Sequence, residues 1–173
     1  MKNIEIELKY RITNPSQIRS KIRKLKVKKL RSGSETNEFY DRGQELFKKK
    51  MIIRLRRSGK EAWLTLKGAA ITQRPVKRLE VETSVDFEST ALILKTLGLK
   101  QVFRYVKKRE EYKLGTAIIT LDQVPKLGWF VEIEANPHKI KLIAEKLGLT
   151  ENQIEDKSYL KMLCSSKKRK HIN

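Results

Sequence analysis

The sequence predicts an α+β fold in which mostly antiparallel strands carry charged side chains on one face and pack against helices with the other. Three observations support it: short segments that alternate charged and apolar residues, glycines where tight connections are needed, and amphipathic stretches with a helical period. The 173 residues are enough for one domain with a real core, and 39% hydrophobic with 35% charged residues are typical of a folded, highly charged chain.

The opening strand places its charged side chains on one face. Glu5, Glu7 and Lys9 alternate with apolar residues, and Glu132 and Glu134 repeat the pattern near the other end of the chain. Closely spaced carboxylates repel one another unless a cation lies between them, and hard divalent metals prefer such oxygen-rich sites. The sequence therefore predicts a metal site.

Further segments show the same alternation and are expected to be strands with short, antiparallel connections. They are residues 52–56, 63–67, 78–82, 107–111 and 119–122. Gly59, Gly115 and Gly128 stand where turns would be required.

Helical patterns separate these strands. Asn14 and Pro15 predict a capped helix start, and Gly98 and Gly148 predict two helix ends. The expected helices cover residues 15–29, 87 or 88 to 97, 137–147 and 157–163. The chain is expected to form a single domain over residues 1–163, followed by a basic, disordered tail over residues 164–173.

The charged strand faces leave two architectures open: an open sheet with one wet face, or a closed barrel with a polar lumen and no exposed edge. The grouping of charge favours the barrel. Acidic residues gather in the strands of Glu5, Glu132 and Asp122, and basic residues gather elsewhere, in the segments of Arg54, Lys67, Arg78 and Lys107. Separate acidic and basic regions suit the binding of a polyanion together with a metal ion. They do little for solubility, which is best served when positive and negative residues are interspersed.

The net charge of +20 has three explanations: nucleic-acid binding, a polyanionic small substrate, or a solvated surface. No apolar run approaches the length of a membrane span, and the first residues lack the apolar stretch of a secretory signal. The single cysteine, Cys164, suits a reducing cytoplasm, and two histidines do not favour zinc. Because no glycine-rich phosphate loop is present, side chains would have to hold any phosphates.

Motifs along nearly the whole chain occur in the order of a known family. They are Glu5-x-Glu7-x-Lys9, Phe39-Tyr40-Asp41, Arg54-Leu55-Arg56, Leu64-Thr65-Leu66-Lys67-Gly68, Arg78-x-Glu80-x-Glu82, the run from Lys107 to Tyr112, Leu121-Asp122, the run from Leu127 to Glu134, and Ser158-Tyr159. In this order they resemble the CYTH superfamily, also called the triphosphate tunnel metalloenzymes. The resemblance is greatest to the class IV adenylyl cyclase branch, with thiamine triphosphatases as near relatives. Glu35 and Asn37 depart from the family pattern, in which glutamine and an acidic residue are commoner.

The resemblance implies an antiparallel β-barrel tunnel with helices packed on the outside and a charged lumen. It also implies a divalent metal, Mg²⁺ or Mn²⁺. The implied metal ligands are Glu5, Glu7, Asp122, Glu132 and Glu134, and the implied phosphate-binding residues are Lys9, Arg54, Arg56, Lys67, Arg78, Lys107 and Arg109. Lys9 and Asp122 are also implied catalytic residues. Tyr40 either assists proton transfer or only makes a structural hydrogen bond, and Glu80 and Glu82 either bind a second metal or orient Arg56 and Arg78.

The reaction that this resemblance favours is conversion of ATP to cyclic AMP and pyrophosphate. The alternative reaction is hydrolysis of inorganic tripolyphosphate, thiamine triphosphate, or a nucleoside or RNA 5′-triphosphate. A non-catalytic binder of polyphosphate or nucleic acid is the alternative from a different class. The expected partners are a triphosphate small molecule and RNA at the basic surface, without a membrane, for a cytoplasmic monomer or homodimer.

Overall fold

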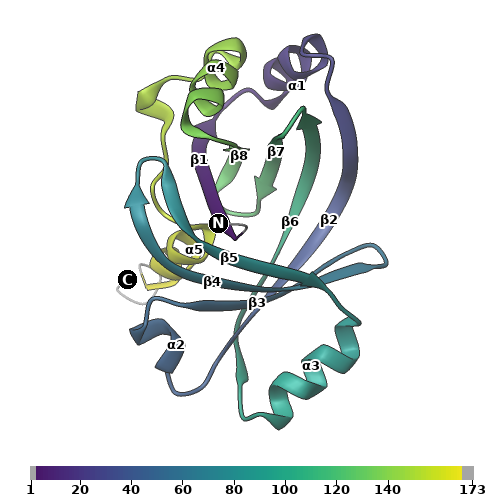
Figure 1. Ribbon diagram of the computed structural model, residues 1–173, viewed down its shortest axis with the longest axis vertical. Coiled ribbons are helices and arrows are strands. Elements are labelled where there is room, and N and C mark those ends of the chain that lie inside the picture. Colours follow the sequence, from purple (N-terminus) through teal and green to yellow (C-terminus); the bar gives the residue numbers. More distant parts are fainter. Residues whose placement is uncertain (1–2, 169–173) are drawn as a thin grey trace. The chain divides into compact units, whose positions relative to one another are not determined.

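The structure is a computed structural model, and it describes residues 3–168 (Figure 1). Its strands form a closed antiparallel barrel in the order β1-β5-β4-β3-β2-β6-β7-β8. The strands are β1 (Ile4–Ile12), β2 (Lys28–Asp41), β3 (Ile52–Ser58), β4 (Glu61–Gln73), β5 (Val76–Ser84), β6 (Lys100–Leu114), β7 (Ala117–Val124) and β8 (Gly128–Glu134). The helices are α1 (Pro15–Lys24), α2 (Glu45–Lys48), α3 (Phe87–Thr96), α4 (Pro137–Leu147) and α5 (Tyr159–Lys168), with a 3₁₀ turn over Glu151–Gln153. The predicted antiparallel barrel is therefore confirmed.

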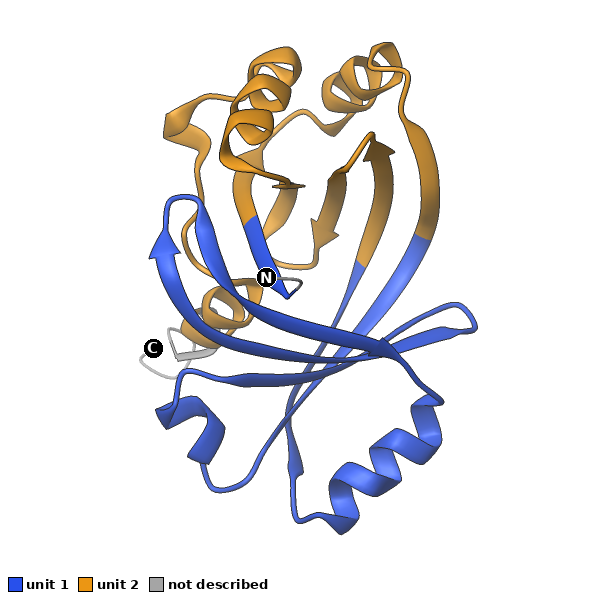
Figure 2. Cartoon of the chain, viewed as in Figure 1, with its two compact units in different colours: residues 1–6, 33–107 blue, residues 7–32, 108–173 orange. Residues whose placement is uncertain are grey.

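The chain divides into two compact units (Figure 2). Among the described residues, unit 1 comprises residues 3–6 and 33–107, and unit 2 comprises residues 7–32 and 108–168. The boundaries fall inside strands, so β1, β2 and β6 each contribute to both units.

Unit 1 buries the apolar face of its strands beneath α3. Tyr40, Leu55, Phe87 and Leu94 belong to one buried cluster. The helix begins at Asp86, whose side chain accepts a hydrogen bond from the backbone N–H of Ser89 at 2.8 Å. It ends before Gly98, which adopts the left-handed φ of 81° that favours glycine. The arginines on either side of Leu55 therefore lie on the face opposite α3.

Unit 2 packs α4 against β8 and against α1. Ile18 and Ile22 of α1 and Ile143 of α4 are buried, as their helical spacing predicts. The Nζ of Lys21 donates a hydrogen bond to the carbonyl oxygen of Leu147 at 2.9 Å, which neutralises part of the negative end of α4. The predicted extent of α4 is confirmed.

Four segments differ from expectation, and one of them is β2, which was not among the predicted strands. Helix α1 ends at Lys24 rather than at residue 29, because Lys26 adopts a left-handed φ of 53° and β2 begins at Lys28. Helix α2 was not expected. Helix α5 includes residues 164–168 of the expected tail, and residues 169–173 lie outside the described residues. The single domain over residues 1–163 stays a prediction. Among the described residues, no helix combines the length and the apolar character needed to cross a bilayer.

Candidate functional site

The register of β3, β4 and β5 gathers charged residues on one face of unit 1. Residues opposite one another on neighbouring strands share a face, so Arg54 lies beside Thr65, and Thr65 lies beside Glu82. Lys67 lies opposite Glu80 on the same face. The alternation seen in the sequence is thus continued across three strands, with the charges opposite the apolar core.

Lys67 joins two carboxylates. Its Nζ lies 3.0 Å from Oε1 of Glu5 and 2.6 Å from Oε2 of Glu80, and Nε of Arg78 lies 3.2 Å from Oε2 of Glu5. Burial raises the pKa of Glu5 against the pull of Lys67, and a hydrogen bond with Glu80 adds to the increase. Burial acts in the same direction on Glu80, but Lys67 and the hydrogen bond with Glu5 outweigh it and lower the pKa of Glu80.

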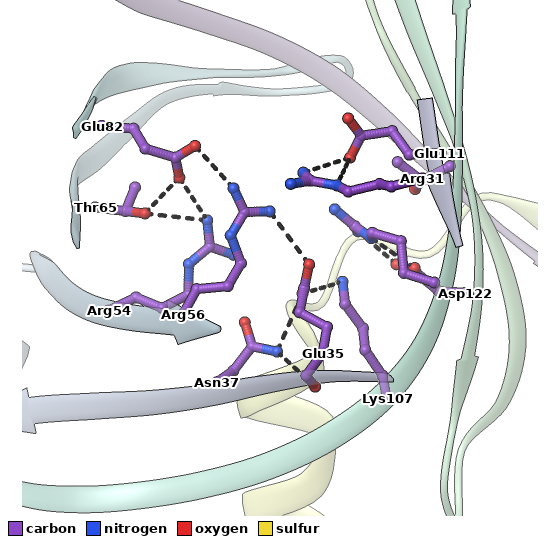
Figure 3. A network of polar contacts seen from close by, with 12 residues as sticks. Arg31, Glu35, Asn37, Arg54, Arg56, Thr65, Glu82, Lys107, Glu111 and Asp122 are labelled. Atoms are coloured by element: carbon purple, nitrogen blue, oxygen red, sulfur yellow. Dashed lines mark hydrogen bonds and ion pairs between the residues drawn. The ribbon is translucent and has the colours of Figure 1, made fainter. Parts of the chain in front are cut away.

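Glu82 holds the two arginines of β3 (Figure 3). It accepts hydrogen bonds from Oγ1 of Thr65 at 2.6 Å, from Nη2 of Arg56 at 2.8 Å and from Nη2 of Arg54 at 3.5 Å. Burial opposes ionisation of Glu82, but Arg56, Thr65 and Arg54 outweigh it and lower the pKa. The guanidinium of Arg56 also lies 4.7 Å from the ring centre of Trp63. Both arginines are consequently fixed in orientation.

Glu35 and Asn37 belong to the same cluster, although neither was among the predicted site residues. Glu35 is 1% exposed, and its carboxylate lies 3.3 Å from Nη1 of Arg56 and 3.3 Å from Nζ of Lys107 (Figure 3). The amide of Asn37 donates to Oε1 of Glu35 at 3.1 Å. The available signal was their spacing of two on a strand and their departure from the family pattern.

Tyr40 is the predicted catalytic residue that unit 1 does not bring to this cluster. Its ring belongs to the apolar cluster beneath α3, and its hydroxyl donates to Oε2 of Glu38 at 2.8 Å. Burial and the neighbouring carboxylate of Glu38 raise its pKa. These contacts are those of a structural hydrogen bond.

Unit 2 pairs its acidic strands directly. Glu7 lies opposite Glu134, and Lys9 lies opposite Glu132, in the register of β1 and β8. The Nζ of Lys9 lies 3.3 Å from Oε1 of Glu132 and 4.5 Å from the ring centre of Tyr159. Like charges directly opposite one another destabilise a sheet, so the Glu7–Glu134 pair is a costly arrangement unless a cation compensates it.

Asp122 binds Arg109, which is the second predicted cationic site residue of unit 2 after Lys9. It is fully buried, and Arg109 binds it through two parallel hydrogen bonds, from Nε to Oδ1 at 2.7 Å and from Nη2 to Oδ2 at 2.5 Å. The same Nη2 lies 2.6 Å from Oε2 of Glu132, and the hydroxyl of Tyr159 donates to Oδ2 of Asp122 at 3.0 Å.

A further ion pair in unit 2, between Arg31 and Glu111 at 2.6 Å, was not predicted because residue 31 follows a segment expected to be helical (Figure 3).

The predicted residues thus separate into two groups. Unit 1 brings together Glu5, Arg54, Arg56, Lys67, Arg78, Glu80, Glu82 and Lys107, and unit 2 brings together Glu7, Lys9, Arg109, Asp122, Glu132 and Glu134. Within residues 3–168, no three Asp, Glu, His or Cys side chains are arranged as a ready metal site. Cationic side chains contact the carboxylates instead.

The fold is a closed antiparallel barrel whose strands carry charged side chains on one face. Comparison of the sequence with models of known families identifies the family that has this domain. The model of the CYTH domain family matches residues 3–159. The chain therefore belongs to the CYTH domain family.

Two relatives carry the name of adenylate cyclase. A candidate adenylate cyclase of Methanocaldococcus jannaschii is 28% identical over 171 residues, which cover 92% of this chain and 98% of that protein. The adenylate cyclase CyaB of Aeromonas hydrophila is 26% identical over 175 residues, which cover 92% of this chain and 88% of that protein.

Solved structures share the fold. A candidate adenylate cyclase from Vibrio parahaemolyticus superimposes with a TM-score of 0.86 at 21% identity, over 95% of this chain and 99% of that one. HpAC1 from Hippeastrum, a candidate adenylyl cyclase with a dominant triphosphatase activity, has a TM-score of 0.72 at 18% identity, over 94% of this chain and 96% of that one.

Proposed function

We propose that this chain is a divalent-metal-dependent enzyme that acts on a triphosphate. The observation that carries the proposal is the group of cations on one strand face of unit 1, each held by a carboxylate. These cations are Arg54, Arg56, Lys67, Arg78 and Lys107. Guanidinium and ammonium groups held in this way can exchange a carboxylate for phosphate oxygens with little loss of side-chain freedom. A protein that only needed surface charge would not bury them.

The donor chemistry of unit 2 fits Mg²⁺ or Mn²⁺. Glu7, Glu132 and Glu134 lie on one face of β1 and β8, and carboxylate oxygens are the ligands that hard divalent cations prefer. Asp122 is also proposed as a metal ligand of unit 2, and Glu5 is proposed separately as a metal ligand of unit 1. When bound, the metal neutralises charge on phosphate oxygens and makes the phosphorus more electrophilic.

The chain's own residues would bind and orient the substrate. Arg54 and Arg56 have fixed planes, so they can donate paired hydrogen bonds to adjacent phosphate oxygens and stabilise the charge that grows on the leaving group. Lys9 is 8% exposed and held by Glu132, which positions its ammonium to donate a hydrogen bond or a proton to an oxygen.

The favoured reaction is adenylyl cyclisation, in which the ribose 3′-hydroxyl attacks the α-phosphorus and pyrophosphate leaves. The names of the two relatives support it. The alternative is hydrolysis, in which water attacks the terminal phosphorus of tripolyphosphate, thiamine triphosphate or a nucleoside or RNA 5′-triphosphate, and orthophosphate leaves. The triphosphatase activity of the Hippeastrum protein supports this alternative, because the same fold hosts it.

A product analysis tests the proposal. The purified protein is incubated with ATP, tripolyphosphate, thiamine triphosphate or a 5′-triphosphorylated RNA, each with Mg²⁺ or Mn²⁺, beside a Glu5→Ala/Glu7→Ala double variant. Cyclic AMP with pyrophosphate, absent from the variant, establishes the cyclase. Orthophosphate without a cyclic product establishes the triphosphatase. No turnover of any substrate leaves only a non-catalytic binder of polyphosphate or nucleic acid.

A further inference from the structure

Residues 19–31 form a strongly basic segment of unit 2, called the basic segment below. It contains eight Lys or Arg residues and no Asp or Glu, and the first acidic residue after it is Glu35. The whole chain has 40 basic and 20 acidic residues, so the basic segment has a higher ratio of basic to acidic residues than the chain as a whole. The eight cations are Arg19, Lys21, Arg23, Lys24, Lys26, Lys28, Lys29 and Arg31.

The fold turns part of this charge toward solvent. The basic segment covers the second half of α1, a turn at Lys26 and the start of β2 (Figure 1). Ile18 and Ile22 fill the buried stripe of α1, so the helix uses its apolar side chains in the core of unit 2. Its cationic side chains are left for the other faces.

Contacts within unit 2 account for half of the cations. Arg19 pairs with Glu110 at 2.7 Å and Lys29 lies 3.8 Å from the same carboxylate. Lys21 and Arg31 have the contacts described above, with the end of α4 and with a carboxylate of β6.

The other four cations of the basic segment are Arg23, Lys24, Lys26 and Lys28. All four are exposed, and none has an ion pair with any residue that the structure describes. Arg23 and Lys24 complement the negative end of α1, but Lys26 and Lys28 lie beyond the helix and have no such role.

We propose that the basic segment binds the phosphodiester backbone of a nucleic acid. Closely spaced cations without counterions gain most from a ligand that carries a regular row of negative charges, because binding releases the ions condensed on that ligand. Helix α4 extends the positive surface, since it packs against α1 and exposes Lys141 and Lys146 (Figure 1). This binding is separate from the triphosphate chemistry proposed above.

The apolar residues favour nucleic acid over a membrane surface. Helices that lie on membranes bury large apolar side chains in the lipid, whereas the isoleucines of α1 are buried in the protein. Leu30, 41% exposed, is the large apolar side chain that the basic segment exposes.

The aromatic residues predict backbone contact without base recognition. Trp129 is covered by the guanidinium of Arg19 at 4.9 Å, and the ring of Tyr112 lies 5.8 Å from Nζ of Lys29. Because these rings already face cations, they are not stacking platforms for bases. Binding is therefore expected to be independent of sequence and steeply dependent on salt.

Fluorescence anisotropy tests the proposal, with a labelled mixed-sequence RNA as a single strand and as a duplex, in EDTA, over a series of salt concentrations. The variant Arg23→Gln/Lys24→Gln/Lys26→Asn/Lys28→Gln removes the four unpaired cations; asparagine at residue 26 tolerates the left-handed backbone. The matched control, Lys48→Gln/Lys49→Gln/Lys50→Asn/Lys60→Gln, removes the same charge from exposed positions of unit 1, with asparagine at residue 50 because its backbone is also left-handed. The first variant is expected to bind at least about tenfold more weakly, with a salt slope smaller by about 2 to 4, and the control within about threefold of wild type.

Three outcomes overturn the proposal. In the first outcome, the wild-type protein does not bind RNA at low salt. In the second, both variants lose the same affinity for RNA, which means that net charge alone is responsible. In the third outcome, the basic-segment variant loses binding to phosphatidylserine vesicles but keeps its affinity for RNA, which assigns the segment to a membrane. Failure of the proposed enzyme function is distinguished because turnover of ATP and tripolyphosphate is measured separately, on the same samples, after circular dichroism has shown that each variant is folded.

Discussion

Unit 1 and unit 2 both place site residues on one face of their strands, but in opposite proportions. Unit 1 sets the cations Arg54, Arg56, Lys67, Arg78 and Lys107 against the carboxylates of Glu5, Glu35, Glu80 and Glu82. Among the predicted residues of unit 2, Glu7, Asp122, Glu132 and Glu134 accompany two cations, Lys9 and Arg109. The excess of cations suits phosphate oxygens, and the excess of carboxylates suits a divalent metal. Under the proposed function, unit 1 would supply most of the phosphate-binding cations and unit 2 most of the metal-binding carboxylates.

The largest effect is expected from the acidic group of unit 2. Glu132→Gln should lower metal-dependent turnover by about 10²–10³-fold, because a proposed ligand of the divalent metal is lost. Affinity for tripolyphosphate in EDTA should not fall, since the cations of unit 1 remain. Steady-state kinetics and isothermal titration calorimetry check the two halves of this prediction. Glu145→Gln on exposed α4 is the control, and an equal loss of metal-free binding would contradict the division of tasks.

The buried carboxylate of unit 1 should matter most for stability. Glu35→Gln leaves Arg56 and Lys107 without their shared anion, which should lower the free energy of unfolding by about 3 kcal/mol. Tripolyphosphate should then stabilise the variant more than it stabilises wild type, because it supplies the missing negative charge. Urea unfolding with and without tripolyphosphate measures both effects, with exposed Glu61→Gln as the control. A stability difference that tripolyphosphate does not reduce would count against the assignment of these cations to phosphate.

A cation of unit 1 should affect binding with or without metal. Arg56→Gln should weaken tripolyphosphate binding in EDTA by about tenfold or more, since a hydrogen bond to a charged group contributes roughly 1.5–3 kcal/mol. Arg56→Lys should restore only part of the affinity, because lysine lacks the planar pair of donors. The adjacent Arg57 is exposed and pairs with Glu88, so Arg57→Gln is a matched control from the other face of the same strand. Calorimetry that showed equal losses for both positions would argue for general charge attraction.

The smallest expected effect is a pH dependence of the free energy of unfolding, caused by Glu110, which belongs to neither group of site residues. Burial opposes ionisation of Glu110, but the hydrogen bond from Tyr112 and the contact with Arg19 outweigh it and lower the pKa below the ordinary 4.5. A lowered pKa stabilises the fold above pH 4.5, and this stabilisation is lost as the pH falls through the folded-state value. The unfolding free energies of wild type and Glu110→Gln should therefore differ by no more than about 1 kcal/mol at pH 7 and converge below pH 4.5. Urea unfolding over that range measures the difference, and a gap that widens on acidification contradicts the assignment.

Strand periodicity made most of the barrel predictable. Each strand with a strict alternation, such as those of Glu5, Arg54 and Glu132, was recognised because its two faces meet different surroundings. Strand β2 was not predicted. Its start was hidden because the basic segment continues the composition of α1, and only the backbone conformation at Lys26 shows where the helix ends. Helix α2, with four residues, is too short to show a period.

The site was predictable by residue type but not by pairing. The family motifs supplied the charged residues, whereas the choice of partner depends on register and on side-chain reach. Glu35 was recognised only as a departure from a pattern, and burial between two cations gives it a role. Tyr40 was placed among the catalytic residues by its motif, but its position in the alternation puts it on the face of Glu38 and the apolar cluster.

The strands β1, β2 and β6 begin in one unit and end in the other, so the chain changes unit three times, each time in the middle of a strand. No linker separates the units, and neither unit is a continuous stretch of sequence. A gene fragment that encoded one unit alone would have to be cut inside paired strands and rejoined. Genetic exchange at a single breakpoint therefore cannot transfer the residues of one unit to a relative without parts of the other unit.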